Sequence, residues 1–588
     1  MAERQGMLPL AVSATRAAWL PALDRLTYLA ALGLLTAAPF EVLDPIIAFP
    51  PIITFTYLKL LIWLVIALWL ARNALSGRWP GLDTPLALPI LAFLAVMLAS
   101  LAVAPAYKLE AFKAVNRSVN GMVAYLVAVT TFTTGKRIEA AFKGVIASAM
   151  AVAALGLLEA AGVAPAVAFL SLFKERPTYV GGLLRVSATF QYATILAVFL
   201  EMAAPLLIGY AAVREGTGRR LAWPAYAGLA LVLEALILTF TRSALAGLGA
   251  GLVAMLALAW RRGLRPAVRP VLAGGAITLL LLAFTAAWNQ SVAVRFATEN
   301  DSGWFSAAYD PPGPLALQTG ETVPVEVGVT NLGRATWVAG GERPFALSYH
   351  WVDPQRDRSI GYAGARAALP HDVAPGQSVR VSILVTAPAQ SGPWLIEWDM
   401  IQTGILWFAQ KGSATAQTPV DVAPGPVAAP ALPAAAAEPV AVKAPDVVDR
   451  RTLWTLALKM FLARPLLGVG PDNFRQVYGE YAGMTAWDRG IHANNMYLEA
   501  FADLGLLGGI ALLAVLISAV RLALSAIFRR PDGPLALWAL AVAGSLAAFL
   551  THSFFDYFLE FTSIYLLFWM LLGLVASIAT RTDVLRDG

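Results

Sequence analysis

The chain contains no cysteine, and charged residues are scarce. The absence of cysteine excludes disulfides, thiolate nucleophiles and cysteine-ligated zinc sites. Charged residues make up 14% of the 588 residues, whereas soluble domains carry roughly 25%. Hydrophobic residues reach 58%. These proportions exclude an ordinary soluble protein and indicate that most of the chain lies in a lipid bilayer.

Histidine is almost as rare, with four in the whole chain. His350, His371, His492 and His552 are scattered, which predicts no metal-ligand cluster. The Gly-Val-Gly segment at 468–470 is followed by no Lys-Ser or Lys-Thr pair, so it predicts a tight turn rather than a nucleotide site. We therefore expect no metal and no cofactor.

Apolar runs near twenty residues long have the length that spans a hydrocarbon core. The sequence contains about twelve of them, nine in the first half and three near the end. They cover approximately 26–43, 54–71, 84–104, 118–134, 140–162, 192–212, 221–240, 243–260, 268–288, 504–527, 535–552 and 561–579.

Basic residues between these runs predict the orientation in the membrane. The net charge of +6 arises from short basic clusters between apolar runs, so it does not indicate nucleic-acid binding. By the positive-inside rule, alternate basic connections place both termini in the cytoplasm. Lys108, Lys113 and Arg117 are the one exception. We expect a multi-pass membrane protein, with residues 289–503 outside the cytoplasm.

The large loop contains a segment of a different kind. Hydrophobic and polar residues alternate with period two in 322–329, 345–351 and 378–385, and turn residues separate these runs. Short alternating strands at this spacing are typical of a β-sandwich. The expected fold is therefore an α-helical polytopic membrane protein with an extracytoplasmic, all-β, Ig-like sandwich inserted in its large loop.

Six segments follow from these patterns. They are a transmembrane block at 1–290, an outer loop at 291–312, the sandwich at 313–422, a Pro/Ala-rich linker at 423–447, an outer helical loop at 448–503 and a second transmembrane block at 504–588.

A polar cluster lies directly before the tenth apolar run. It contains His492 with Asn494, Asn495 and Tyr497, and small glycines follow it. One interpretation is helix punctuation, because Asn caps helix starts and glycine lets helices pack closely. The other is a site at the membrane boundary, with His492 as general base and the amides and Tyr497 orienting sugars by hydrogen bonds.

Several arginines are expected at the same outer side. An arginine at bilayer depth costs roughly 2.5–3.5 kcal/mol, so it needs a reason. Snorkelling to the interface is one reason. A shared diphosphate ligand is another, because the guanidinium fork matches phosphate oxygens. The candidates for holding a diphosphate are Arg185, Arg242, Arg295, Arg450 and Arg451.

These motifs in this order resemble the O-antigen ligase and polymerase superfamily. They are an arginine before one span, Thr-x-Thr-Arg-Ser at 239–243, Pro-Leu-Leu-Gly-Val-Gly at 465–470, and His-Ala-x-Asn-x-Tyr-Leu-Glu at 492–499 with Gly-x-x-Gly at 505–508. The resemblance implies a glycosyltransferase that moves a glycan from undecaprenyl diphosphate to a glycan, lipid or protein acceptor outside the cytoplasm. It also implies a histidine base, arginines on the diphosphate, and neither nucleotide sugar nor metal. A protein of this kind is expected in a bacterial inner membrane.

Two departures from the family pattern stand out. Counting back from Gly505, the family's histidine position holds Asn494, and an amide takes up no proton at neutral pH. The role of base then passes to His492 or to other groups. The sandwich is the second departure. Two alternatives remain: a lipid-linked glycan flippase or exporter, and an inactive relative that displays the sandwich as a binding module.

Overall fold

The computed structural model describes the chain apart from residues 1–3, 50–52, 80–82, 175–176, 181–182, 219–221, 289–291, 293–294, 296–301, 342–343, 354–357, 404–405, 426–447, 485–486, 530–532 and 581–588. The chain divides into two compact units. The helical unit comprises Met1–Thr178, Arg185–Phe284 and Val448–Gly588. The β unit comprises Tyr179–Leu184 and Thr285–Val447. Most of the predicted linker at 423–447 lies outside the described residues.

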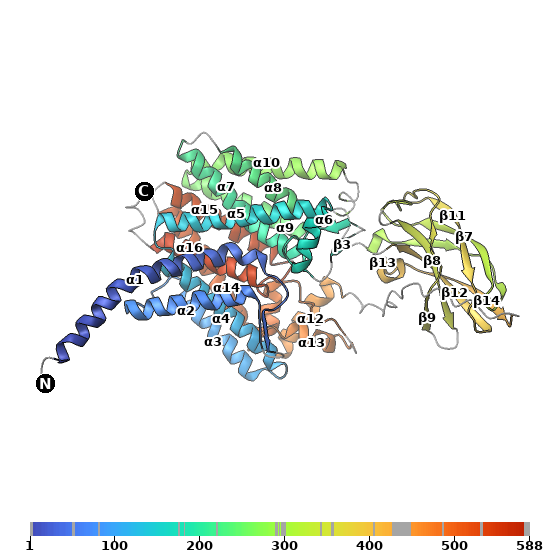
Figure 1. The fold of residues 1–588 in the computed structure, drawn as a ribbon, viewed down its shortest axis with the longest axis horizontal. Coiled ribbons are helices and arrows are strands. Elements are labelled where there is room, and N and C mark those ends of the chain that lie inside the picture. The colour runs from blue at the N-terminus through green and yellow to red at the C-terminus, as the bar shows by residue number, and fades with distance from the viewer. Residues whose placement is uncertain are drawn as a thin grey trace. The chain divides into compact units, whose positions relative to one another are not determined.

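The helical unit is a bundle whose longer helices run side by side (Figure 1). Its helices are α1 (Arg4–Ala37), α2 (Tyr57–Ser76), α3 (Ala87–Val103), α4 (Lys108–Thr131), α5 (Gly135–Ala160), α6 (Ala164–Leu170), α7 (Ala193–Gly216), α8 (Trp223–Leu238), α9 (Arg242–Arg262), α10 (Arg265–Trp288), α12 (Arg450–Ala463), α13 (Phe474–Tyr481), α14 (Met496–Arg529), α15 (Pro534–His552) and α16 (Thr562–Thr580). A short hairpin of β1 (Ile47–Phe49) and β2 (Ile53–Phe55) lies between α1 and α2 in the chain. A second hairpin, β3 (Thr178–Val180) with β4 (Leu183–Arg185), lies between α6 and α7 in the chain, and its residues 179–184 belong to the β unit.

Each of the twelve predicted apolar runs overlaps one of these helices. Among the described residues, eight helices are long and apolar enough to cross a membrane, namely α2, α5, α7, α9, α10, α14, α15 and α16. Helices α3 and α8 are apolar but shorter. The predicted class, a polytopic helical membrane protein with a β insert, is confirmed. The sequence patterns missed α6 and both hairpins, because these elements are short, whereas α12 and α13 lie in the segment predicted as an outer helical loop.

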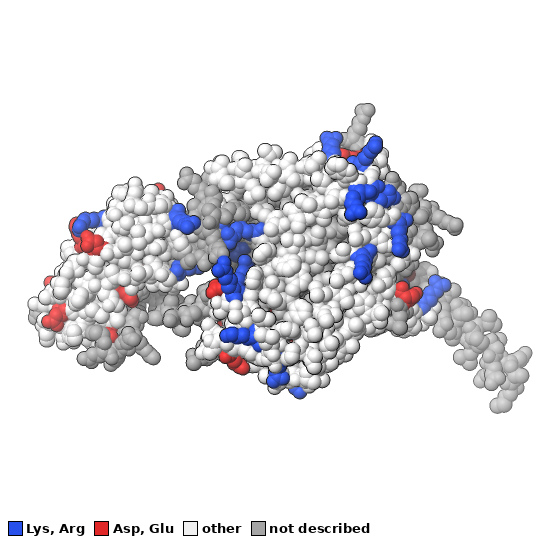
Figure 2. All heavy atoms as spheres, turned by 180° about the vertical axis from the view of Figure 1, so that it is seen from behind, with Lys and Arg blue, Asp and Glu red and all other residues white. Residues whose placement is uncertain are grey.

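Charged side chains on the surface of the helical unit are distributed as expected for a membrane protein. In the space-filling view, basic side chains on one face of the helical unit gather at opposite ends, with a broad uncharged surface between them (Figure 2). An uncharged belt between charged ends is what a protein immersed in a bilayer presents to lipid.

Small residues set the packing at the centre of the bundle. Helix α7 is almost entirely surrounded by protein, because 94% of its most apolar 18-residue stretch is buried. Helices α9 and α15 touch through Gly247 and Gly251 of α9. A Cβ atom at Gly247 would lie 2.8 Å from the carbonyl oxygen of Ala548, and one at Gly251 would lie 2.7 Å from that of Gly544. Glycines at this spacing let membrane helices approach backbone to backbone.

Helix α14 is broken near its start. Gly505 has φ 66° and ψ −165°, so the helix stops and resumes there. The segment 465–470 fills the break: Leu506 N donates to Pro465 O at 2.7 Å, and Gly470 N donates to Asp503 O at 2.9 Å. A Cβ atom at Gly505 would lie 2.3 Å from the carbonyl carbon of Leu466. The two glycine motifs of the sequence therefore form one interlocked structure.

The β unit contains two packed sheets. Its larger sheet has the order β10 (Ala367–Ala368), β8 (Phe345–Asp353), β12 (Gly392–Gln402), β14 (Ala416–Ala423), β6 (Leu315–Gln318), with β9 (Arg358–Ala363) beside β8 and β13 (Leu406–Trp407) beside β12. The smaller sheet has the order β11 (Ser378–Thr386), β7 (Thr322–Asn331), β5 (Ala307–Asp310). Trp337, Trp398 and Val327 are among the fully buried residues of its core. The three alternating runs of the sequence form β7, β8 and β11.

Candidate functional site

The polar cluster before α14 is partly helix punctuation. Asn495 caps the helix: its Oδ1 accepts hydrogen bonds from the backbone of Tyr497 and Leu498, both at 3.0 Å. The Tyr497 hydroxyl donates to the carbonyl oxygen of Leu550 at 2.8 Å. Asn494 has φ 50°, in the left-handed region that asparagine tolerates. These contacts support the capping interpretation for Asn495, and Tyr497 ties α14 to α15. The sugar-orienting role of Asn494, Asn495 and Tyr497 stays a prediction.

His492 lies between two carboxylates. Its Nδ1 is 2.5 Å from Glu499 Oε1, and its Nε2 is 2.5 Å from Glu560 Oε2. The ring stacks on Tyr557, with 4.7 Å between ring centroids, and only 7% of the residue is exposed. Glu499 also accepts a hydrogen bond from Ala493 N at 2.8 Å. Both ring nitrogens of His492 are therefore engaged.

The charges of this cluster determine its protonation. Burial alone lowers the pKa of His492, but the charges and hydrogen bonds of Glu499 and Glu560 outweigh it and hold that pKa well above its usual value. Burial raises the pKa of Glu560, but the protonated His492 and the nearby Arg117 and Arg475 lower it to about 2. His492 is thus a cation with both N–H groups donating. This geometry disfavours the predicted role of general base, because a base needs an unprotonated nitrogen facing the acceptor.

A chain of ion pairs extends from Glu560. Arg475 Nη2 lies 3.9 Å from Glu560 and its Nε lies 3.0 Å from Asp472. Arg117 Nη2 lies 3.1 Å from the other oxygen of Asp472. The pairing of Arg117 with a buried carboxylate accounts for one of the basic residues that contradicted the positive-inside rule. Asp503 completes the cluster, because both of its oxygens accept backbone hydrogen bonds, from Asp472 N and Phe474 N.

Three members of this cluster meet the distance criterion for a metal site. One ligand atom from each of Asp472, His492 and Glu499 lies within 4.8 Å of the others. The same atoms already have partners, since Arg117 and Arg475 bind Asp472 and His492 donates to Glu499. A metal ion would have to displace two arginines and a proton, so these residues fit a self-satisfied ion-pair network better than a metal centre.

Arg185 is held beside the start of α9. Its Nε donates to the carbonyl oxygen of Thr239 at 2.9 Å, and its Nη2 donates to Thr241 Oγ1 at 3.0 Å. Thr241 is the N-cap residue of α9, and Arg242 is the first residue of that helix. The structure therefore brings Arg185 and Arg242, two of the predicted diphosphate-binding arginines, onto adjacent backbone segments.

A buried ion pair fixes the segment that follows Arg185. The Lys174 ammonium contacts both the Glu159 carboxylate and Ser187 Oγ. The second oxygen of Glu159 accepts hydrogen bonds from the backbone N–H groups of Ser187, at 3.2 Å, and Ala188, at 2.7 Å. Glu159 and Lys174 are 4% and 9% exposed. Nothing in the sequence motifs identified this pair as support for Arg185.

Asp556 lies where the arginines and the histidine cluster meet. It is in the connection between α15 and α16, and the charges of Arg450, His492 and Arg185 all act on its carboxylate. Burial raises the pKa of Asp556, although the backbone N–H of Tyr557 and those three cations lower it in part. Its Oδ1 accepts the Tyr557 N–H at 2.9 Å. The acidic connection between two spans, visible in the sequence, was the signal that could have identified Asp556 and Glu560.

The other three predicted arginines, Arg450, Arg451 and Arg295, belong to neither β4 nor α9, the elements that contain Arg185 and Arg242. Arg450 and Arg451 are the first two residues of α12, and both are exposed. The charge of Arg450 acts on the Asp556 carboxylate. The charge of Arg451 acts on Asp449, the residue that caps the start of α12. Arg295 belongs to the β unit.

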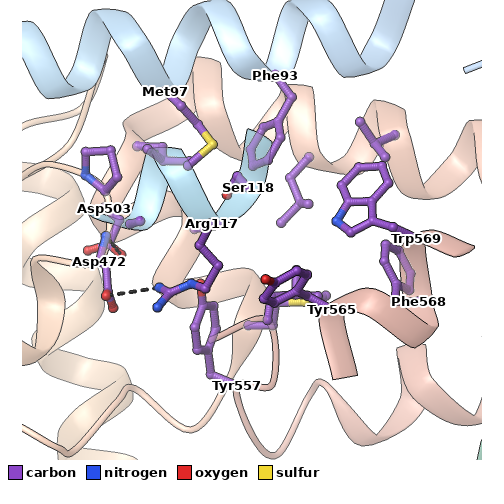
Figure 3. A pocket seen from close by; sticks show the side chains of 18 residues that line it. Phe93, Met97, Arg117, Ser118, Asp472, Asp503, Tyr557, Tyr565, Phe568 and Trp569 are labelled. Carbon is purple, nitrogen blue, oxygen red and sulfur yellow. Dashed lines mark hydrogen bonds and ion pairs between the residues drawn. The ribbon is translucent and has the colours of Figure 1, made fainter. Parts of the chain in front are cut away.

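A narrow cavity adjoins the ion-pair network (Figure 3). It offers about 60 Å³, room for a few water molecules. Arg117, Asp472 and Tyr557 lie at one part of it, and Phe93, Phe568 and Trp569 lie at another. The cavity therefore grades from charged to apolar between α3, α4, α14 and α16.

Comparison with known proteins bears on this region. Residues 405–513 match the family model described as O-antigen ligase. The predicted resemblance is confirmed. The match supports a membrane glycosyltransferase-like function for the chain. No curated protein matches it.

The O-antigen ligase match contains only part of the cluster. His492, Glu499 and Asp503 lie within it, on and before α14. Arg185, Arg242, Asp556 and Glu560 come from other parts of the bundle. Counting Arg117, the fold thus adds three arginines and two carboxylates to the residues that the family match covers.

Proposed function

We propose that this protein transfers a glycan from a polyprenyl diphosphate carrier to an acceptor hydroxyl on the extracytoplasmic side of the membrane. The observation that carries the proposal is the position of Asp556, a half-buried carboxylate influenced by Arg185, Arg450 and His492. A carboxylate for the acceptor proton and arginines for the leaving diphosphate are the two parts that this reaction needs.

The step would proceed as a single displacement. The acceptor oxygen bonds to the anomeric carbon of the donor sugar while the bond from that carbon to the diphosphate oxygen breaks. The acceptor proton passes to Asp556, and the charge that develops on the diphosphate is met by Arg185 and Arg242. One displacement inverts the configuration at the anomeric carbon. Diphosphate is a good leaving group, so positioning and charge stabilisation supply most of the catalysis.

His492 takes a different role from the one predicted. As a cation between Glu499 and Glu560, it holds the start of α14 against the connection between α15 and α16. Its positive charge also acts on Asp556. We propose that His492 positions and electrostatically tunes the base.

An exporter remains the second candidate, because α14 is broken at Gly505 and transporters build their sites from broken helices. In this protein, however, the segment 465–470 fills the break with backbone hydrogen bonds. A break closed in this way favours a fixed site over a moving half-helix.

Release of free polyprenyl diphosphate tests the proposal. The purified full-length protein would be incubated with an undecaprenyl diphosphate-linked glycan and a glycan or lipid acceptor. An enzyme releases the carrier, whereas an exporter or an inactive relative does not. Absence of release with every acceptor class tried, from protein that binds the donor, would contradict the assignment.

Two substitutions test the roles. Asp556→Asn should lower turnover by about 10²–10⁴-fold, the usual contribution of a general base, with donor binding retained. Arg242→Lys should weaken donor binding by roughly tenfold or more, because lysine keeps the charge but loses the fork. Asp83→Asn and Arg261→Lys, at exposed positions, are the matched controls. Turnover in Asp556→Asn equal to that in Asp83→Asn would remove Asp556 as the base.

A further inference from the structure

Three polar side chains meet inside the bundle, next to Arg242. Ser243 Oγ lies 2.9 Å from His552 Nε2, and His552 Nδ1 lies 3.0 Å from Glu201 Oε2. Ser243 follows Arg242 in the first turn of α9, His552 ends α15, and Glu201 lies in the middle of α7. The contacts in the bundle therefore connect its interior to the start of α9 through a serine, a histidine and a carboxyl group.

The chain of contacts begins in a fully enclosed position. Glu201 and His552 are both 0% exposed, and Ser243 is partly exposed. A Cβ atom at Gly247 would lie 3.0 Å from Glu201 Oε2, so the glycine leaves the space that the carboxyl group occupies. Glu201 Oε1 has no hydrogen-bond partner among the described residues. None of these three residues has a part in the transfer step proposed above.

The surroundings decide which way the hydrogen bonds run. An ionised carboxylate with one oxygen unsatisfied inside a helix bundle is costly, whereas a carboxylic acid there is tolerated. The neutral acid donates its proton to His552 Nδ1. His552 Nε2 then carries the ring proton and donates to Ser243 Oγ. The Ser243 hydroxyl proton is not used in this chain of hydrogen bonds, so Ser243 can donate it to a further group.

We propose that Glu201, His552 and Ser243 form a hydrogen-bond relay that turns the Ser243 hydroxyl into a donor for a diphosphate oxygen bound beside Arg242. The inference rests on the proposed function in one respect, the binding of a diphosphate at Arg242. Ser243 is the residue that contacts the ligand, and His552 and Glu201 are positioning residues. The first-turn N–H groups of α9 lie at the same helix end and favour an anion there.

Hydrogen bonds that donate in the opposite direction make a different prediction. If Glu201 were ionised, it would accept the proton of His552 Nδ1, and His552 Nε2 would accept the Ser243 proton. Ser243 would then be an activated nucleophile, as in hydrolases that use a serine, a histidine and an acid. The two directions differ in whether the Ser243 hydroxyl donates to the ligand or reacts as a nucleophile, so they can be distinguished.

Binding of inorganic diphosphate to the purified full-length protein is the test. Ser243→Ala should weaken binding about tenfold, the effect of losing one hydrogen bond to a charged group, and Ser243→Thr should retain it. Glu201→Leu should weaken binding to a similar extent. Glu201→Gln should restore the affinity, because its amide N–H donates to His552 Nδ1 as the carboxylic acid does. Thermal unfolding of each variant separates lost binding from lost folding.

The outcomes separate this inference from the proposed function. If Arg242→Lys leaves diphosphate binding unchanged, the proposed function fails at this site. If Arg242→Lys weakens binding but Ser243→Ala does not, the relay alone is refuted. Glu201→Gln as weak as Glu201→Leu would refute the relay, and covalent labelling of Ser243 by a fluorophosphonate probe would establish the opposite direction of the hydrogen bonds; either result overturns the inference. Should Glu201→Leu fail to fold, the two Ser243 variants and Glu201→Gln still decide it.

Discussion

Replacing Glu560 by glutamine should destabilise the protein in a pH-dependent manner. The substitution keeps a hydrogen-bond acceptor for His492 Nε2 but removes one of the two negative charges beside the ring. It also removes the partner that Arg475 approaches at 3.9 Å. The change therefore tests the charge of the cluster with little change in its shape.

The magnitude follows from the pKa of Glu560. A fall from the ordinary value of 4.5 to about 2 corresponds to roughly 3 kcal/mol of stabilisation of the ionised form. The side chain keeps 26% of its surface exposed, so solvent screening reduces that figure. We expect a loss of about 2 kcal/mol in the free energy of unfolding at neutral pH.

The sign of the pH dependence differs for the two partners. The pKa of Glu560 is lowered on folding, so its contribution is present above pH 4.5 and is lost as the pH falls toward 2. The pKa of His492 is raised on folding, so its contribution is complete below pH 6.5 and is lost as the pH rises through the folded value. The pair is therefore strongest between about pH 4.5 and 6.5, and its contribution declines as the pH rises further.

Thermal unfolding of the full-length protein in detergent, followed from pH 5 to pH 10, measures this effect. Glu560→Gln should lower Tm relative to wild type, and the gap should narrow at alkaline pH. Glu480→Gln, at an exposed position in α13, is the control. A gap at pH 6 no larger than that of Glu480→Gln would show that His492 is not a buried cation, and the case for it as the base would return.

Two further predictions concern the backbone and the orientation. Gly505→Ala should abolish insertion of folded protein, measured as the level in isolated membranes, because its Cβ would meet the Leu466 backbone; Gly249→Ala, with open space around it, should accumulate normally. Because the chain has no cysteine, single cysteines report orientation directly. Ser391→Cys should react with a membrane-impermeant maleimide in intact cells, and Arg78→Cys only after permeabilisation; the reverse pattern would invert the proposed topology.

Much of the architecture followed from composition and periodicity. Long apolar runs specify membrane helices by length alone, and the alternation in 322–329 specifies a strand by its period. The break in α14 could not be predicted in that way, because it depends on the segment 465–470 lying against Gly505, a contact between separate segments of the chain. The glycine motifs were visible, but their function as two halves of one structure was not.

The candidate site also depends on contacts between distant segments, which sequence patterns do not predict. Sequence spacing identified His492 but could not show its neighbours, and its chemistry depends on them. Glu560 is 68 residues further along the chain and Glu499 is seven, yet both lie 2.5 Å from the ring. A single exposed carboxylate would have left His492 able to act as a base, whereas the buried Glu499 and the partly exposed Glu560 together keep it protonated. The role of base then falls to a group whose pKa burial raises despite nearby cations, and among the described residues outside the membrane spans Asp556 meets that requirement beside the arginines.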